Sequence, residues 1–212
     1  MTDVSNVATS HDWTLLADTA ALEKTMTALA ANGLNPVLVE SAAEAKRNVL
    51  DLLPEGIDVF TATSATLTAT GIAEAINESG RYISLRKQMM AMDRTTQHRE
   101  MRVIAGTPSY VVGSVHAITE QGHVFVASFG GSQLTSYVYG ADHVIWVVGT
   151  QKLVKDTDAA FRRIEEHSLP LESERLEKAV GRKSDAAKIL VIRREVLPNR
   201  ITTILVKEPL GF

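Results

Sequence analysis

The stretch that decides the fold of this chain begins Ser109-Tyr-Val-Val-Gly-Ser-Val-His-Ala-Ile-Thr-Glu-Gln-Gly-His-Val-Phe-Val-Ala127 and ends His143-Val-Ile-Trp-Val-Val-Gly-Thr-Gln-Lys-Leu-Val-Lys-Asp156. Between these two segments lies Phe129-Gly-Gly-Ser-Gln-Leu134. The apolar runs have the composition of buried β-strands, and each ends in small, hydroxylic or Gly residues. Open α/β sheets bind ligands beyond the carboxyl ends of their strands. The pattern therefore predicts an α/β fold with a polar ligand site in this region.

The composition is that of one large domain. The chain has 212 residues, no cysteine and a formal net charge of −3. A domain of this length buries about 70% of the surface that its unfolded chain exposes. Without cysteine, the chain has no disulfide, thiolate metal site or cysteine-ligated iron–sulfur cluster. Its mild acidity argues against binding to a nucleic-acid backbone, which needs concentrated Lys and Arg.

No segment resembles a membrane span or a secretory leader. The longest apolar runs, such as Val144–Val148, are far shorter than the about 20 residues that cross a bilayer. The N-terminal residues 1–6 lack a basic region followed by an apolar one. We therefore expect a cytoplasmic protein without a membrane partner. We also expect residues 1–12 to be flexible and residues 13–212 to form a single domain.

Short apolar strands alternate with amphipathic helices along the chain. A Gln121-Gly122 turn predicts a hairpin between 117–120 and 123–127, and the Pro198-Asn199 turn suggests pairing between 189–192 and 201–206. The alternation itself predicts a mainly parallel sheet covered on both faces, with a few antiparallel additions. The expected parallel strands are 37–39, 57–61, 82–85, 109–113 and 143–148, and the expected helices cover 15–31, 41–52, 72–79, 88–104, 133–139, 156–164 and 171–180.

Three motifs carry a family resemblance. They are Ser114-Val-His-Ala-Ile-Thr-Glu-Gln-Gly122, Val147-Val-Gly-Thr-Gln-Lys-Leu-Val-Lys-Asp156 and Ile201-Thr-Thr-Ile-Leu-Val-Lys-Glu-Pro-Leu-Gly-Phe212. Their order from about Leu22 onward resembles the LUD domain family, the lactate-utilisation LutC/YkgG-type proteins. The resemblance implies a three-layer α/β/α fold, similar to the sugar-phosphate isomerase and CoA-transferase group.

The resemblance also implies a role in bacterial lactate oxidation to pyruvate. In that role the protein would act beside partners that carry iron–sulfur clusters, and would bind a small anionic ligand or a partner subunit. It does not imply an isolated catalytic activity. We expect no iron–sulfur cluster or metal in this chain, and the cofactor is left unknown. Whether the protein forms a homo-oligomer is left open.

The chain departs from the family pattern at two loops. Family members often have Gly-Gly-Ser-x-Thr-Leu where this chain has Ala62–Leu67, and Gly-x-Gly-Asn-Arg where it has Phe129–Gln133. Gln133 therefore replaces an arginine, which would remove a bidentate contact to an anion. An arginine from the helical region could take its place, and the choices are Arg81, Arg86, Arg94, Arg99 and Arg102.

Two polar loops are candidates for ligand contact. Thr63, Ser64 and Thr66 follow an expected strand and open a helix, so they could hold an anion or simply cap the helix. The second loop has two glycines that let the backbone approach a ligand, although a tight strand-to-helix connection would need them too. Its candidate residues are Gly130, Gly131, Ser132 and Gln133.

The two strand ends at Gly113 and Gly149 supply further candidates. Lys152 could neutralise a phosphate or carboxylate, or could be a surface lysine. We add Gly149, Ser114 and His116 to the expected ligand-binding residues, although relatives commonly have Asn in place of His116. A metal site is not expected, because no histidines and carboxylates have ligand spacing.

Glu120 is the candidate catalytic carboxylate. CoA-transferases have their catalytic Glu in a Glu-x-Gly context, which Glu120-Gln121-Gly122 matches. It could attack an acyl-CoA and form a mixed anhydride, or act as the base of an isomerase. Alternatively, Glu120 is a solvated residue before a turn. An enzyme that uses Glu120 is therefore the alternative to the accessory, ligand-binding role.

Overall fold

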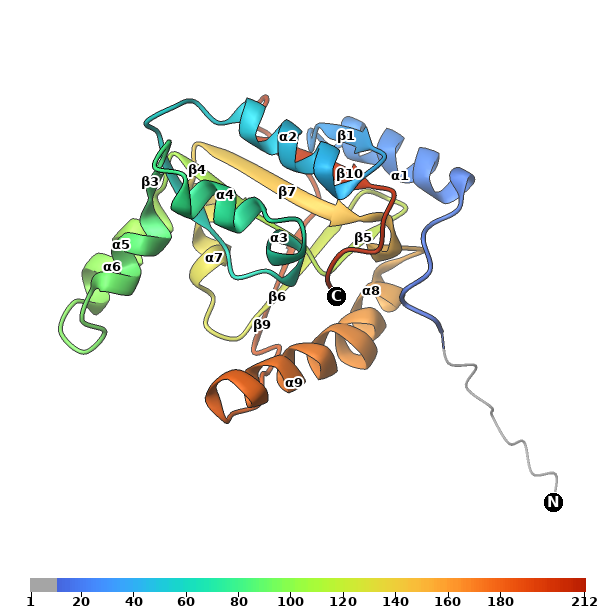
Figure 1. Cartoon of the computed structure of the whole chain (residues 1–212). Helices are drawn as coiled ribbons and strands as arrows, with labels where there is room; N and C mark the ends of the chain where they lie inside the picture. The colour runs from blue at the N-terminus through green and yellow to red at the C-terminus, as the bar shows by residue number, and fades with distance from the viewer. Residues whose placement is uncertain (1–10) are drawn as a thin grey trace, which may run out of the picture.

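The protein is described here by a computed structural model, which covers residues 11–212. Its centre is a six-stranded sheet in which every pair of neighbouring strands is parallel, in the order β1-β10-β7-β4-β2-β3 (Figure 1). The prediction of an α/β fold with a mainly parallel sheet is confirmed. The strands are β1 (Pro36–Val39), β2 (Asp58–Thr61), β3 (Ile83–Ser84), β4 (Tyr110–Gly113), β7 (His143–Gly149) and β10 (Ile201–Val206).

Strand β7 is apolar from Val144 to Val148 because both faces of the sheet are covered there. In β7, Val144, Trp146 and Val148 pack on one face, and Ile145 and Val147 on the other. Side chains of a strand alternate between faces, so a strand buried on both faces has a continuous apolar sequence. This is why the run at 143–148 stands out in the sequence.

Three helices cover one face of the sheet. They are α2 (Ala42–Leu52), α3 (Ala65–Ala69) and α4 (Ile72–Glu78), whose apolar side chains share one core cluster with Ile145, Val147 and Ile204. Ser41 caps α2, since its hydroxyl accepts a hydrogen bond from Glu44 N–H. Figure 1 shows these helices along one side of β7.

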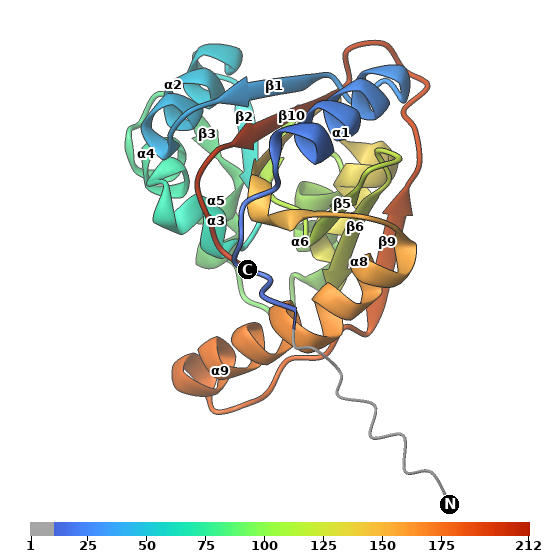
Figure 2. The ribbon, with the colours of Figure 1, turned by 90° about the vertical axis from the view of Figure 1, so that its right-hand side faces the viewer.

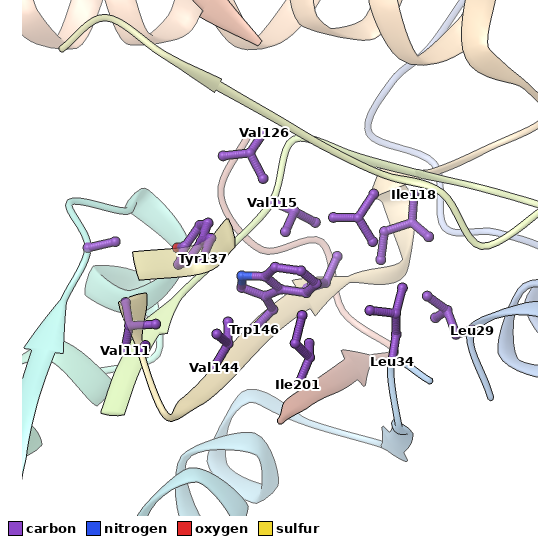
Figure 3. Packing of buried hydrophobic residues seen from close by; sticks show 14 of the residues in the cluster. Leu29, Leu34, Val111, Val115, Ile118, Val126, Tyr137, Val144, Trp146 and Ile201 are labelled. Atoms are coloured by element: carbon purple, nitrogen blue, oxygen red, sulfur yellow. The ribbon is translucent and has the colours of Figure 1, made fainter. Parts of the chain in front are cut away.

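A mixed layer covers the other face. It contains α1 (Thr19–Ala31), α5 (Leu85–Ala91), α6 (His98–Gly106), α7 (Ser132–Thr135) and a π-helical turn, η1 (Ser136–Gly140). In Figure 3 the rings of Trp146 and Tyr137 meet at the centre of this layer. Their centroids are 5.5 Å apart and the rings meet edge to face at 80°. Such aromatic pairs contribute about 0.5–1.5 kcal/mol beyond the area they bury.

A second sheet packs over part of this layer. Its order is β8-β5-β6-β9, formed by β5 (Ala117–Thr119), β6 (Val124–Ser128), β8 (Leu153–Val154) and β9 (Lys188–Ile192). The predicted hairpin between β5 and β6 is confirmed by their antiparallel pairing. Helix α8 (Thr157–Arg163) and a second π-helical turn, η3 (Ile164–Ser168), pack against this sheet. Helix α9 (Leu169–Val180) follows them, and Figure 2 shows it at the lower edge of the molecule.

The predicted pairing of the last two strands is wrong. β10 lies between β1 and β7 in the parallel sheet, whereas β9 pairs antiparallel with β6 in the second sheet. The reason is burial: β10 is apolar enough to lie inside a covered sheet, and β9 is largely exposed. The segment 88–104, expected to be helical at least in part, contains the end of α5, which stops at Ala91, and most of α6, which begins at His98.

Two further expectations concern the N-terminal part. Leu15 does not belong to the first helix, which begins at Thr19 behind the capping residue Asp18. Residues 1–10 of the segment expected to be flexible lie outside the described part of the chain. No helix within residues 11–212 has both the length and the apolar character needed to cross a membrane.

Candidate functional site

A cavity of about 530 Å³ opens at the carboxyl edge of the parallel sheet. Three of its walls follow strands: the segment after β2, the segment after β4, and the 3-10 turn after β7. The loop between β6 and α7, the helices α5 and α9, and residues 182–186 complete it. The position agrees with the general rule that open α/β sheets bind ligands beyond the carboxyl ends of their strands.

Lys152 lies in the wall of this cavity, and its side chain is buried. Its Nζ donates hydrogen bonds to Thr66 Oγ1 at 3.0 Å and to Ser114 Oγ at 3.2 Å. Only 1% of Lys152 is exposed. No carboxylate of residues 11–212 lies within ion-pair distance of the amine. Burial lowers the pKa of Lys152 well below its usual value, and the charge of Arg163 lowers that pKa further.

Thr66 and the C-terminal segment fix one side of the amine. Thr66 Oγ1 donates to the carbonyl of Leu210 at 3.1 Å, so its lone pairs are left to accept from Lys152. Gln151 Nε2 donates to the same carbonyl, also at 3.1 Å. Gly211 has φ +63°, and a Cβ there would lie 2.5 Å from Thr66 Oγ1, so only glycine lets this segment approach. Phe212 then lines the cavity.

His116 lies beside Lys152 in the cavity wall. Its Nδ1 accepts a hydrogen bond from Ala127 N–H at 3.1 Å, which assigns the ring proton of the neutral imidazole to Nε2. Burial lowers the pKa of His116 to about 3, and the charges of Lys152 and Arg163 add to that effect. At neutral pH the ring of this lining residue is therefore uncharged, with Nε2–H as its hydrogen-bond donor.

Arg163 lies behind this wall and is fully buried. One nitrogen, Nη1, donates to the carbonyl of His116 and to Ser168 Oγ. The other two, Nε and Nη2, have no partner among the described residues. Burial lowers the pKa of Arg163 to about 10. Lys152 and Arg163 are thus two buried basic groups, and neither forms an ion pair with a carboxylate in the described part of the chain.

Further arginines line the mouth of the cavity. Arg86 donates to Thr63 Oγ1 and lies over the ring of Phe60, while Arg182 lies over the ring of Phe129 at 4.9 Å. Burial lowers the pKa of Arg86, and the charge of Arg94 lowers it further. The acidic residues of the lining are Glu172, which forms a bidentate pair with Arg175, and Asp185. The remaining charge of the lining is positive.

The structure brings together most residues that the sequence proposed for ligand contact. Nine of them line the cavity: Thr63, Ser64, Thr66, Ser114, His116, Gly130, Ser132, Gln133 and Lys152. The idea that an arginine from the helical region compensates for Gln133 agrees with the positions of Arg86 and Arg94. Ser64 has a second role, because its hydroxyl caps α3 by accepting from Leu67 N–H.

Three proposed residues lie elsewhere or serve packing. Gly131 has φ +90° at the start of α7 and is not in the lining. A Cβ on Gly149 would lie 2.5 Å from the carbonyl oxygen of Glu208, so this glycine makes room for the C-terminal segment. Glu120 is outside the cavity lining, and its carboxylate pairs with Lys24 of α1 at 2.7 Å. The geometry thus provides no support for catalysis by Glu120 in this cavity.

The sequence reasoning missed Arg163, and its position carried a signal. Ala160, Arg163 and Ile164 are spaced three and four residues apart, so they share the buried face of α8 and η3. An arginine on an apolar helix face is a buried charge that needs a partner. In the described part of the chain, no three His, Asp or Glu side chains come together as metal ligands.

The comparisons with known proteins agree with the motif order. The model of the LUD domain matches residues 22–206. Among solved structures, the chain is similar to a DUF162 family protein from Deinococcus radiodurans, with a TM-score of 0.55 and 12% identity over 91% of this chain and 99% of that one. At this identity the likeness shows the fold alone. A search of curated proteins finds no match.

Proposed function

Because the chain belongs to the LUD domain family, we propose that it binds a small anionic molecule in the Lys152 cavity and serves lactate utilisation beside iron–sulfur partner proteins. The observation that carries the binding proposal is the buried Lys152 amine, which has two hydroxyl partners and no carboxylate partner within residues 11–212. Burying an ionised amine without a partner is very costly, so the amine either stays neutral or awaits an anion. An anionic ligand would be the partner that the ionised amine lacks, and beside a neutral amine it would be held by the arginines of the lining.

The surroundings support an anion rather than a neutral ligand. Arg86, Arg94 and Arg182 line the cavity, and Arg163 lies behind it with two unpartnered nitrogens. Charge-assisted hydrogen bonds to arginine are about twice as strong as neutral ones, and a guanidinium suits a carboxylate or phosphate geometrically. The lining has two acidic residues: Glu172, which is paired with Arg175, and Asp185. The cavity is therefore electrostatically suited to a small carboxylate or phosphate.

Thermal unfolding with a panel of anions tests this binding. The panel is L-lactate, pyruvate, inorganic phosphate and a sugar phosphate, each at increasing concentration. A ligand at a hundredfold excess over its Kd stabilises the folded state by about 2.7 kcal/mol, which raises the Tm of a protein of this size by about 5–10 °C. Lys152→Met should abolish the shift. Lys155→Met is the matched control, because Lys155 is an exposed lysine three positions along the chain.

The pathway part of the proposal has its own test. A strain that lacks the encoding gene should grow normally on glucose and poorly on lactate. The wild-type gene should restore growth on lactate, and the Lys152→Met gene should not. Unchanged growth of the deletion strain on lactate would contradict the pathway role. The absence of any anion-dependent Tm shift in the wild-type protein would contradict the binding role.

A further inference from the structure

The hydrogen bonds of Lys152 leave its nitrogen lone pair free. A neutral amine has two N–H groups and one lone pair, and Thr66 and Ser114 accept the two N–H groups. Both hydroxyls belong to residues of the cavity lining. The lone pair thus has no donor among the described residues. Burial and the nearby charge of Arg163 both lower the pKa of Lys152, which favours this neutral form.

We propose that Lys152 Nζ forms an imine with a small carbonyl compound that carries a carboxylate or phosphate group. The inference rests on the proposed function, because it places the reacting carbonyl of an anionic ligand in the same cavity. Lysines that act as nucleophiles are desolvated or lie beside another cationic group. Lys152 meets both conditions, because it is buried and Arg163 lies nearby.

The reaction balances without an oxidant, a reductant or a metal. The amine lone pair forms a bond to the carbonyl carbon, and the C=O π electrons move to the oxygen, which takes up a proton. The nitrogen loses a proton, and the resulting carbinolamine has one N–C bond and one hydroxyl group. The hydroxyl takes up a proton from solvent and leaves as water while the nitrogen lone pair forms the C=N bond, and the nitrogen then returns its remaining proton to solvent to give the neutral imine. One water molecule is released for each imine formed.

Neighbouring groups can serve these steps without changing their own charge. Ser114 Oγ and Thr66 Oγ1 already hold the amine in one orientation. His116 is neutral at physiological pH and carries its proton on Nε2, so it can donate a hydrogen bond but not act as a strong acid. We assign His116 a positioning role, in which Nε2–H orients an oxygen of the ligand.

The arginines define the class of substrate. A simple ketone or aldehyde offers nothing to Arg86, Arg94 and Arg182, whereas a 2-oxo acid or a phosphorylated ketone offers an anion to them. The cavity volume of about 530 Å³ lies within the range of small-molecule sites. The shared chemistry is therefore a carbonyl and an anionic group in one small molecule, and the two sources of the anion are separable by experiment.

Borohydride trapping tests the inference on the full chain. The protein is incubated with pyruvate, with dihydroxyacetone phosphate or with acetone, reduced with sodium borohydride, and analysed by intact mass and peptide mapping. We expect one reduced adduct per chain on the peptide that contains Lys152. Acetone should give about tenfold less adduct at equal concentration, the loss that corresponds to one charge-assisted hydrogen bond. Whichever anionic probe reacts faster identifies the source of the anion.

Peptide mapping of the wild-type protein locates the adduct even where a variant fails to fold. Lys152→Met should lose the adduct, and Lys155→Met should keep it. Label spread over exposed lysines, or equal trapping by Lys152→Met, would overturn the inference. Equal trapping with acetone would overturn the substrate class. If anions raise the Tm but neither probe forms an adduct, the imine is wrong and the proposed binding stands. If neither effect occurs, both are wrong.

Discussion

Arg200 at the amino edge of the parallel sheet and Lys152 at its carboxyl edge are both buried basic groups, but their surroundings differ. Every guanidinium nitrogen of Arg200 is used: they donate to the carbonyls of Ser136, Tyr137 and Ala141 and to the carboxylate of Glu195. Lys152 has two hydroxyl partners and no carboxylate. The guanidinium of Arg200 is thus fully hydrogen-bonded by the protein, whereas the amine of Lys152 has no charged partner among residues 11–212.

The difference teaches how to separate a structural cation from a functional one. Buried polar groups in folded proteins are almost always hydrogen-bonded, so each exception needs a reason. Arg200 joins the start of β10 to the η1 turn, and its ion pair with Glu195 at 2.7 Å is largely buried. We therefore assign Arg200 a structural role. Lys152 and Arg163 have unused capacity beside a cavity, and that combination is typical of a binding site.

The largest expected effect is from Arg200→Met. The substitution leaves three carbonyl groups and the Glu195 carboxylate without their partner, and removal of one member of a buried ion pair costs about 3–5 kcal/mol. Urea unfolding should report a free energy of unfolding lower by this amount. Arg194→Met, which changes an exposed arginine, should leave the free energy within about 0.5 kcal/mol.

The contrast depends on Lys152→Met. This variant should change the free energy of unfolding of the ligand-free protein by less than about 1 kcal/mol, because a buried amine without a charged partner contributes little to stability. A loss as large as that of Arg200→Met would show that the two basic groups are equivalent, and the contrast between the two edges would fail.

The next largest effect on stability concerns Tyr137, which contacts residues at both the amino and the carboxyl edge of the parallel sheet. Its carbonyl accepts from Arg200, while its hydroxyl lies against Gly113 at the end of β4. A Cβ at position 113 would lie 1.7 Å from that hydroxyl oxygen. Gly113→Ala should therefore lower the free energy of unfolding by about 3 kcal/mol, the upper end of the usual cost of overpacking.

A double-mutant cycle separates this overlap from other effects. Tyr137→Phe removes the oxygen that meets the new methyl group, so Gly113→Ala should cost about 1–2 kcal/mol less in that background. A Gly113→Ala cost that is the same in both backgrounds would show that the hydroxyl is not the group displaced. Anion-dependent Tm shifts in the same variants would tell whether the packing behind β4 also supports the cavity.

The pH dependence of stability should reveal the buried His116. Its pKa is about 3 in the folded protein, and the usual value of 6.5 applies to the unfolded chain. Below pH 6.5 the unfolded chain takes up a proton that the folded protein does not, so stability falls as the pH is lowered from 6.5 toward 3. Between pH 7 and pH 5 the loss from this group is about 2 kcal/mol.

His116→Asn should remove that part of the pH dependence. An asparagine oxygen can accept the hydrogen bond from Ala127 N–H without taking up a proton. Urea unfolding at a series of pH values should give a shallower slope for the variant, while His98→Asn, at an exposed helix position, serves as the control. Parallel slopes for wild-type protein and His116→Asn would mean that the ring is accessible to protons in the folded state.

The sequence was sufficient to predict the parallel core but not the pairing partners of the last two strands. The run at 143–148 and the polar ends of the strands predicted where β7 lies and which loops meet, because parallel strands share one carboxyl edge. The turn at Pro198-Asn199 wrongly predicted that β9 pairs with β10, because a local turn signal does not determine which strands pair. The better signal was the apolar run at the end of β10, because a strand with consecutive apolar residues is buried on both faces and is typical of an inner parallel strand.

The candidate site was predictable only in part, for a related reason. Ser114, Lys152 and Thr66 follow parallel strands, so their convergence follows from topology. Arg163 lies behind the cavity wall because α8 and η3 pack on the second sheet, and Arg182 enters the lining from the segment after α9. Neither position follows from the order of the parallel strands. Glu120 matched a short catalytic pattern, but β5 belongs to that second sheet, and its end faces α1 instead of the cavity.

The smallest expected effect comes from Glu120→Gln, and it tests whether the contrast between satisfied and unsatisfied basic groups extends to the surface. Lys24 has what Lys152 lacks, a carboxylate at 2.7 Å, but 61% of its side chain is exposed. Exposed ion pairs contribute about 0–1 kcal/mol, so Glu120→Gln should lower the free energy of unfolding by less than 1 kcal/mol, and less still in high salt. Anion-dependent Tm shifts and borohydride trapping should match the wild-type protein. Loss of either, or turnover of CoA esters that Glu120→Gln abolishes, would place the chemistry at the end of β5 and leave Lys152 as a buried amine with a structural role.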